Sequence, residues 1–162
     1  MNKRLLAERY TKSLLPVFYA DLSKHDGDSF MSDDAYGQLC TVTGALWTPQ
    51  GRTFDGTDDK ISVTYNAVLH PTTALSILSW FKTDTTAEDQ LWCLGHNNRL
   101  AIRGDLAGDK IAGGLYVNAA SVSFTSTTAV CDSVWRLCST IFDGSTIKLY
   151  LNTTQEDSQP AV

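Results

Sequence analysis

The stretch Gly51-Arg-Thr-Phe-Asp-Gly-Thr-Asp-Asp-Lys-Ile-Ser-Val63 decides the fold of this chain. It places an aromatic residue, an Asp-Gly turn and a second acidic turn between two strand-like segments. Turns favour Asp because its side chain bonds to nearby backbone groups, and Gly because it tolerates positive φ. The stretch therefore predicts two strands joined by a tight, acidic connection.

Two later stretches have the composition of strands. The first is Leu75-Ser-Ile-Leu-Ser-Trp-Phe-Lys82, and the second runs from Trp135 to Asn152. In the second, apolar Ile147, Leu149 and Leu151 alternate with polar residues, which puts the apolar side chains on one face of a strand. Short strands separated by frequent turn residues are typical of a sandwich.

The dipeptide Asp143-Gly144 lies between two alternating runs. Asp-Gly is one of the strongest hairpin signals, because both central residues of a type I′ turn need positive φ. We therefore expect a hairpin with a type I′ turn at this position.

Taken together, the three stretches resemble the LamG-like jelly rolls of the concanavalin A-like lectin/glucanase superfamily, to which the pentraxins also belong. The resemblance implies an all-β fold, an antiparallel β-sandwich (jelly roll), over residues 15–152. Residues 153–162 are expected to form a tail, and residues 1–14 a short helical or extended arm. A superfold of this kind carries many functions, so the fold alone does not give the activity.

The run from Val17 to Trp47 resembles LamG-like proteins encoded by tailed phages and environmental viral genomes, which implies a place on the virion surface. In the family, further strands normally follow the last hairpin, and the final one pairs beside the first. Here only ten residues follow Asn152. Three alternatives stay open: a minimal jelly roll, a fragment, or an edge at the expected first strand, Val17–Leu22, that another chain covers.

Composition excludes several classes of protein. The 162 residues are 43% hydrophobic with a net charge of -5, which suits one soluble domain and argues against a basic nucleic-acid surface. Leu5-Leu6-Ala7 is interrupted by Glu8, so no signal peptide is expected, and no apolar run is long enough for a membrane span. The chain is expected to be soluble and made in a cytoplasm.

The first fourteen residues are basic, with four Lys and Arg residues against Glu8, a charge of +3 that leaves -8 for the rest of the chain. Leu6, Tyr10 and Leu14 recur at helical spacing, and Leu5 widens the stripe. We expect this arm to contact another subunit, which predicts a homo-oligomer or larger assembly. A solvated tail is the alternative.

The acidic residues are the candidates for catalytic and metal sites. Glucanases of the superfamily alternate two or three carboxylates along one strand. That pattern is missing, so we expect no enzyme. Asp58 and Asp59 offer oxygen ligands to calcium, as do Asn97 and Asn98, whose place resembles a pentraxin calcium loop. The alternative is that the Asp residues shape a turn, and we expect no cofactor, with calcium as the exception to test.

Sugar recognition needs an aromatic platform beside polar groups, for which Trp92, His96 and Tyr116 are the candidates. We therefore expect a non-enzymatic structural or interaction protein whose partners are other protein subunits. The alternative is a carbohydrate-binding lectin-like module that binds surface glycans.

The expected core consists of Phe54, Ile61, Leu75, Ile77, Trp80, Trp135, Ile141, Leu149 and Tyr150, together with the thiols of Cys93 and Cys138.

Overall fold

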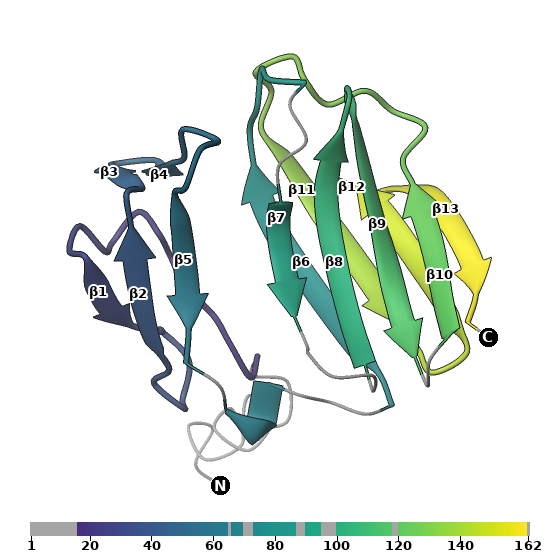
Figure 1. Ribbon diagram of the computed structural model, residues 1–162, viewed down its shortest axis with the longest axis horizontal. Helices are drawn as coiled ribbons and strands as arrows, with labels where there is room; N and C mark the ends of the chain where they lie inside the picture. Colours follow the sequence, from purple (N-terminus) through teal and green to yellow (C-terminus); the bar gives the residue numbers. More distant parts are fainter. Residues whose placement is uncertain are drawn as a thin grey trace, which may run out of the picture. The chain divides into compact units, whose positions relative to one another are not determined.

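The computed structural model describes residues 16–64, 66–69, 73–86, 90–94, 100–117 and 120–161. Within these ranges the chain forms thirteen strands and one short 3-10 helix, η1 (Ala67–Leu69) (Figure 1). It divides into an N-terminal unit that ends at Leu69 and a C-terminal unit that begins at residue 70, and each is described by itself. The arm expected over residues 1–14 lies outside the described residues.

The N-terminal unit contains a three-stranded antiparallel sheet with the order β1-β2-β5 and a separate hairpin, β3-β4. Phe30, Cys40, Val42 and Ala45 form its buried core. The bounds are β1 (Ser29–Met31), β2 (Leu39–Thr43), β3 (Leu46–Thr48), β4 (Gly51–Thr53) and β5 (Lys60–Val63).

One expectation for this unit is wrong. Val17–Leu22 is not a strand, and the first strand, β1, lies further along the chain. The physical reason is that carboxylates replace a strand partner. Backbone N–H groups of Tyr19 and Asp21 donate to Asp side chains instead of to a neighbouring strand.

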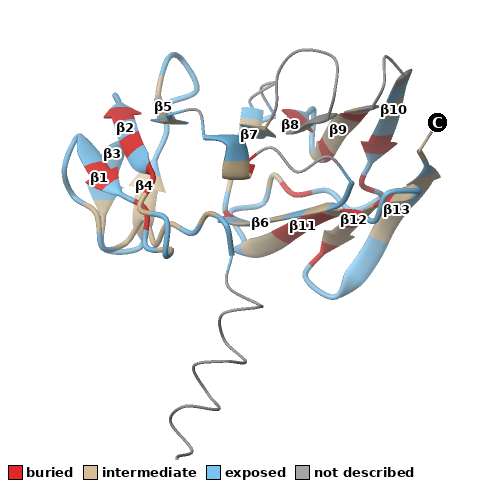
Figure 2. Cartoon of the chain, turned by 90° about the horizontal axis from the view of Figure 1, so that it is seen from below, coloured by how far each residue is buried: buried red, intermediate tan, exposed pale blue. Residues whose placement is uncertain are grey.

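The C-terminal unit is an antiparallel sandwich of two four-stranded sheets (Figure 2). One sheet has the order β10-β9-β8-β7 and the other the order β13-β12-β11-β6. This confirms the expected fold class. The bounds are β6 (Leu75–Phe81), β7 (Gln90–Leu94), β8 (Leu100–Ala107), β9 (Lys110–Val117), β10 (Ala120–Thr125), β11 (Arg136–Phe142), β12 (Thr146–Leu151) and β13 (Thr154–Pro160).

The core of the sandwich is built from the inward side chains of both sheets. Ile147, Leu149 and Leu151 on β12 are buried, as their alternation predicts. They share one cluster with Ile111 and Leu115 of the opposite sheet. Fully burying an aliphatic side chain contributes about 1.5–3 kcal/mol each, so this layer accounts for much of the stability of the unit.

Part of the predicted core is wrong. Trp80, Trp135 and Phe54 are 65%, 43% and 49% exposed. Trp80 is adjacent to buried Phe81 on β6, and successive side chains of a strand point to opposite faces, so Phe81 takes the inward position. Leu149 is buried as expected. The other aliphatic residues of the predicted core, and Tyr150, are half-buried. Cys138 is buried as expected, but Cys93 is exposed.

The end of the chain also differs from expectation. Thr154–Pro160 forms β13, which pairs with β12, where the sequence predicted an irregular tail. The hairpin at Asp143-Gly144 is confirmed, but its turn is not type I′, because only Gly144 has positive φ (96°), and neither Asp143 nor Ser145 does. The Asp143 carboxylate instead accepts the N–H groups of Ser145 and Thr146 and closes the turn itself.

Candidate functional site

The outer surface of the sheet β13-β12-β11-β6 carries exposed apolar side chains. On β6, Leu78 and Trp80 point away from the core and are 61% and 65% exposed. The cross-strand register places Trp80 opposite Leu137 of β11. Next to this pair, Trp135 precedes β11 and is also exposed. We call Leu78, Trp80, Trp135, Leu137 and Tyr150 the outer aromatic face.

The register arranges this face in rows across the strands. Leu78 is opposite Ser139, which is opposite Tyr150 on β12. The Tyr150 hydroxyl donates to Gln155 Oε1 at 2.9 Å, so the phenol is anchored across to β13. Opposed side chains on one face of a sheet lie about 4.5–5.5 Å apart, which makes the rows continuous.

Charged groups lie at two ends of the outer aromatic face. Lys82 holds its ammonium 5.6 Å from the centre of the Trp135 ring, a cation–π distance. Lys148 lies two rows beyond the Trp80–Leu137 pair and has Asp143 at 3.7 Å. The outward positions of β6, β11 and β12 between them carry no carboxylate. The centre of the face is therefore uncharged and, apart from Ser139 and the Tyr150 hydroxyl, apolar.

The turn before β11 is fixed by an ion pair. Arg136 Nη2 donates to Asp132 Oδ2 at 2.6 Å, and Nη1 donates to Oδ1. The hydrogen bonds from Arg136 lower the pKa of the Asp132 carboxyl to about 2. This bidentate pair holds the loop that presents Val134 and Trp135.

The two described residues expected to bind sugar do not share a face. Trp92 on β7 packs against the inner core, with its Nε1 buried and without a partner among the described residues. Tyr116 on β9 follows the inward residue Leu115 and therefore points the other way. His96 lies outside the described residues. Their role in sugar binding stays a prediction.

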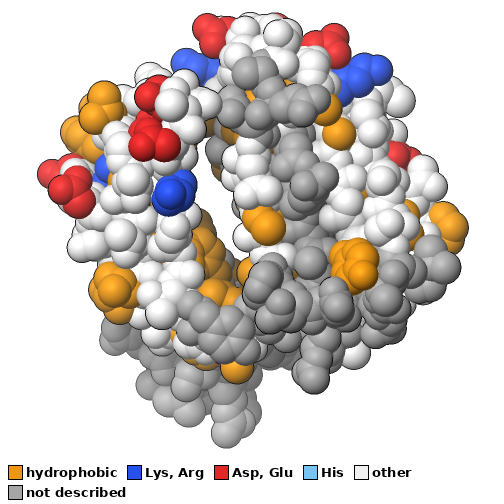
Figure 3. Space-filling model, viewed as in Figure 1, with side chains coloured by type: hydrophobic (Ala, Val, Ile, Leu, Met, Phe, Trp, Pro, Cys, Tyr) orange, Lys and Arg blue, Asp and Glu red, His pale blue; other side chains and the backbone are white. Residues whose placement is uncertain are grey.

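Asp55, Asp58 and Asp59 lie together on the connection between β4 and β5, with one carboxylate oxygen of each within 4.8 Å of the others. Acidic side chains are exposed on the viewed face of the N-terminal unit (Figure 3). However, Asp59 Oδ2 accepts the N–H of Asp55 at 2.9 Å, and Asp55 Oδ1 accepts the N–H of Thr57. These bonds commit two of the three carboxylates to shaping the turn.

Asp59 also packs against the backbone of the preceding loop. A Cβ at Gly44 would lie 1.7 Å from Asp59 Oδ1, and Gly44 has a φ of 73°. The contact explains why a glycine is needed there. The other expected calcium ligands, Asn97 and Asn98, lie outside the described residues, as do Leu5, Leu6, Tyr10 and Leu14, the expected subunit contacts.

The outer aromatic face was missed at the sequence level, although the sequence carries a signal for it. β6 reads Leu-Ser-Ile-Leu-Ser-Trp-Phe, with large apolar residues at both inward and outward positions. A strand that is solvated on one face alternates apolar with polar residues, whereas a strand covered on both faces does not. Trp80 and Trp135 therefore indicate a second apolar face, on the outside of the sheet, rather than the sandwich core.

Comparison with known proteins identifies the family. The model of the concanavalin A-like lectin/glucanases superfamily named Laminin_G_3 matches residues 55–162. The chain belongs to this family. No curated protein matches the sequence of this concanavalin A-like protein.

Sixteen chains of solved structures match it, and two of them illustrate the similarity. Domains LG4-5 of the mouse laminin α1 chain match with a TM-score of 0.52 and 11% identity, over 56% of this chain and 24% of that one. This concanavalin A-like chain thus spans about a quarter of the laminin fragment. An S-layer domain-containing protein from Clostridium thermocellum (residues 221–444) matches with a TM-score of 0.48 and 20% identity, over 83% and 67%. The laminin match supports the fold alone.

No helix in the part of the chain that the structure describes is both long and apolar enough to cross a membrane.

Proposed function

We propose that this concanavalin A-like protein is a non-catalytic interaction module whose outer aromatic face packs against a second copy of the chain. The observation that supports the proposal is the pattern of β6, which is apolar on both faces although its outward residues Leu78 and Trp80 are exposed. Contiguous apolar patches of this kind mark interaction sites in soluble proteins.

The face is suited to pairing with itself. It lies on a sheet, and its charged groups, Lys82 and Lys148, lie at two ends of an apolar centre. A two-fold arrangement buries Trp80 and Leu137 of both copies without burying a charge. Central tryptophans carry a large share of the binding free energy in protein interfaces.

The arm over residues 1–14 is the second part of the proposal. Its charge of +3 against -8 for the remaining residues favours association with a neighbouring copy and makes it sensitive to salt. A helix of this length is marginal alone in water, so the stripe of Leu6, Tyr10 and Leu14 needs a surface to pack on. We propose that the neighbouring copy supplies that surface.

The assembly that we propose is a virion exterior, on which such modules pack side by side. Support for this setting comes from the resemblance of the run Val17–Trp47 to LamG-like proteins of tailed phages.

The test is the molar mass of the full chain, measured by light scattering over a range of concentrations. Replacing both Leu78 and Trp80 with Ser is expected to raise the dissociation constant about 30-fold or more, equivalent to ~2 kcal/mol. Leu46→Ser is the matched control, since Leu46 is 70% exposed but lies in the N-terminal unit. Deleting residues 1–14 is expected to lower the mass while leaving the β-sheet circular dichroism unchanged.

Two results would overturn the proposal. One is a full-length monomer at all concentrations whose Trp80 fluorescence is shielded from a soluble quencher, since the rest of the same chain would then cover the face. The other is a monomer with accessible Trp80 that binds polysaccharides on a glycan array and loses this binding in Trp80→Ser. That outcome would establish the lectin-like alternative.

A further inference from the structure

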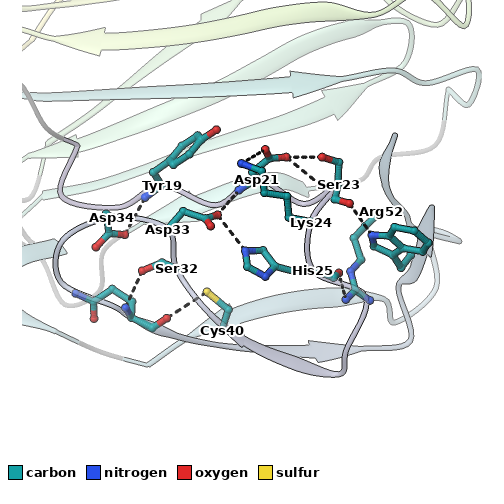
Figure 4. Close-up of polar contacts among 12 residues, drawn as sticks. Tyr19, Asp21, Ser23, Lys24, His25, Ser32, Asp33, Asp34, Cys40 and Arg52 are labelled. Atoms are coloured by element: carbon teal, nitrogen blue, oxygen red, sulfur yellow. Dashed lines mark hydrogen bonds and ion pairs between the residues drawn. The ribbon is translucent and has the colours of Figure 1, made fainter. Parts of the chain in front are cut away.

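Residues 17–27 run beside the sheet of the N-terminal unit without forming a strand, and we call them the strap (Figure 4). Side chains of other segments hold the strap at two places. The first anchor forms hydrogen bonds with Tyr19 and Asp21, and the second with the turn from Ser23 to Gly27. The two anchors differ in chemistry: carboxylates form the first, and an arginine and a tryptophan form the second.

The first anchor consists of two adjacent carboxylates. Asp34 Oδ2 accepts the backbone N–H of Tyr19 at 2.9 Å, and Asp33 Oδ2 accepts the backbone N–H of Asp21 at 2.8 Å. Asp33 also accepts from His25 Nε2 at 3.0 Å. One backbone bond, from the N–H of Asp33 to the carbonyl of Tyr19, completes this anchor.

Both anchoring carboxylates are held in the charged form. The N–H of Asp21, with the His25 ring next, lowers the pKa of Asp33. Burial acts in the opposite direction on Asp34, but Ser32 and the N–H groups of Tyr19, Tyr36 and Gly37 outweigh it and lower its pKa. Protonation of either carboxyl therefore weakens the anchor. The other titratable groups that face it are Asp21, Lys24, His25 and Cys40.

The second anchor does not titrate. Arg52 donates from its guanidinium to the carbonyls of His25, at 2.6 Å, and of Gly27. Trp47 Nε1 donates to the carbonyl of Ser23 at 3.0 Å. Arginine stays protonated throughout the accessible pH range and carbonyl acceptors do not change, so this anchor persists in acid.

The strap covers the core of the N-terminal unit. Phe18, Ala20 and Leu22 pack against the cluster that contains Cys40. The Cys40 thiol is fully buried, and its burial raises its pKa to about 11. With the strap in place, Cys40 is shielded from reagents in solution.

We propose that the strap is an acid-released cover: below about pH 4 its first half, Val17–Leu22, detaches while Arg52 and Trp47 retain the second half as a hinge. A carboxyl whose folded pKa is lowered stabilises the closed form above its unfolded value of 3.8 and ceases to do so as the pH falls. Opening exposes Cys40 and frees the attachment point of residues 1–16.

The test uses the full chain and two measurements between pH 7 and pH 3. The rate at which 4,4′-dithiodipyridine modifies each cysteine is measured by peptide mass spectrometry and divided by the rate of a free thiol at the same pH. Hydrogen exchange compares the amides of Tyr19 and Asp21 with the ladder amides of β2 and β5. Cys138, buried in the core of the C-terminal unit, reports global unfolding.

On acidification, modification of Cys40 is expected to accelerate at least about tenfold while Cys138 and the β2–β5 ladder stay protected. In the double variant Asp33→Asn, Asp34→Asn, Cys40 is expected to be modified at pH 7 as fast as in the acidified wild-type protein. Asp132→Asn, which removes an equally charged carboxyl from the C-terminal unit, is the matched control and should not affect Cys40.

Three outcomes would overturn the proposal. Cys40 and Cys138 become reactive over the same pH range, the ladder amides of β2 lose protection together with Tyr19, or Cys40 stays protected down to pH 3 in a folded protein. If the double variant unfolds the N-terminal unit, the wild-type pH series still decides between these outcomes.

Discussion

Glu156 on β13 accepts two hydrogen bonds from Thr127, one from its backbone N–H at 2.9 Å and one from its hydroxyl at 2.6 Å. The same carboxylate accepts the N–H and hydroxyl of Thr128. Because Thr127 follows β10, these bonds join the edges of the two sheets of the sandwich. The pKa of Glu156 is lowered overall. Burial acts to raise it, but the hydrogen bonds from both threonines outweigh the effect of burial.

Glu156→Gln is expected to destabilise the C-terminal unit by about 1–3 kcal/mol, because the amide cannot accept all four bonds and brings donors of its own toward N–H groups. Urea denaturation followed by circular dichroism measures the change. Ser158→Ala, on the same strand and with an exposed side chain, should change stability by less than about 0.5 kcal/mol. Equal effects of the two substitutions would contradict the role of Glu156.

Acid is expected to remove part of the stability of the C-terminal unit. The hydrogen bonds from Arg136 to Asp132, and from Ser145 and Thr146 to Asp143, lower each pKa from 3.8 to about 2. Carboxyls with lowered folded pKa values stabilise the protein fully above pH 4 and lose this effect as the pH falls toward 2. Asp132→Asn should therefore flatten the pH dependence of urea stability between pH 4 and pH 2. An unchanged slope would show that Asp132 is not coupled to folding.

Truncation is expected to cost much more stability at Leu149 than at Trp80. Leu149→Ala should cost about 2–5 kcal/mol, since the side chain is fully buried between the sheets. Trp80→Ala should cost less than about 1 kcal/mol in a protein too dilute to associate, since its indole is mostly exposed. Thermal denaturation at low concentration compares the two, and a larger loss for Trp80 would place it in a core.

Calcium is not expected to bind at the Asp55, Asp58 and Asp59 cluster, because Asp55 and Asp59 already accept backbone N–H groups of the turn. Calorimetric titration should show no micromolar binding, and millimolar calcium should leave the melting temperature unchanged. Binding with micromolar affinity that disappears in Asp58→Asn or Asn97→Ala would instead reveal a calcium site.

The strands that alternate clearly were predictable from the sequence. Ile147, Leu149 and Leu151 are buried as their spacing predicts, since period-two alternation reports directly on a sheet with one covered face. The failures fall where this logic does not apply. Residue type predicts that Trp80 lies in the core, but its neighbour Phe81 has the inward position. Which of the two side chains is buried therefore depends on the alternation along the strand and not on side-chain size.

The N-terminal strap could not be predicted, because its partners are side chains distant in sequence. Val17–Leu22 has the composition of a strand, yet its N–H groups bond to Asp33 and Asp34. The aspartates themselves read as loop residues. For the candidate site, the sequence supplied Trp80 and Trp135 but not their orientation, which requires the register of β6 against β11.

The strand β13 reads Thr-Gln-Glu-Asp-Ser-Gln-Pro and contains no aliphatic or aromatic side chain, yet it forms the border of its sheet. A border strand presents unpaired backbone groups on which another chain can add a strand, and charges and proline are the residues that discourage such growth. The carboxylates of Glu156 and Asp157 already accept hydrogen bonds from Thr125, Thr127 and Thr128 along this border, and Pro160 lacks the N–H that an added strand would need. The segment whose composition resembles a disordered tail therefore protects the sandwich against strand-by-strand aggregation.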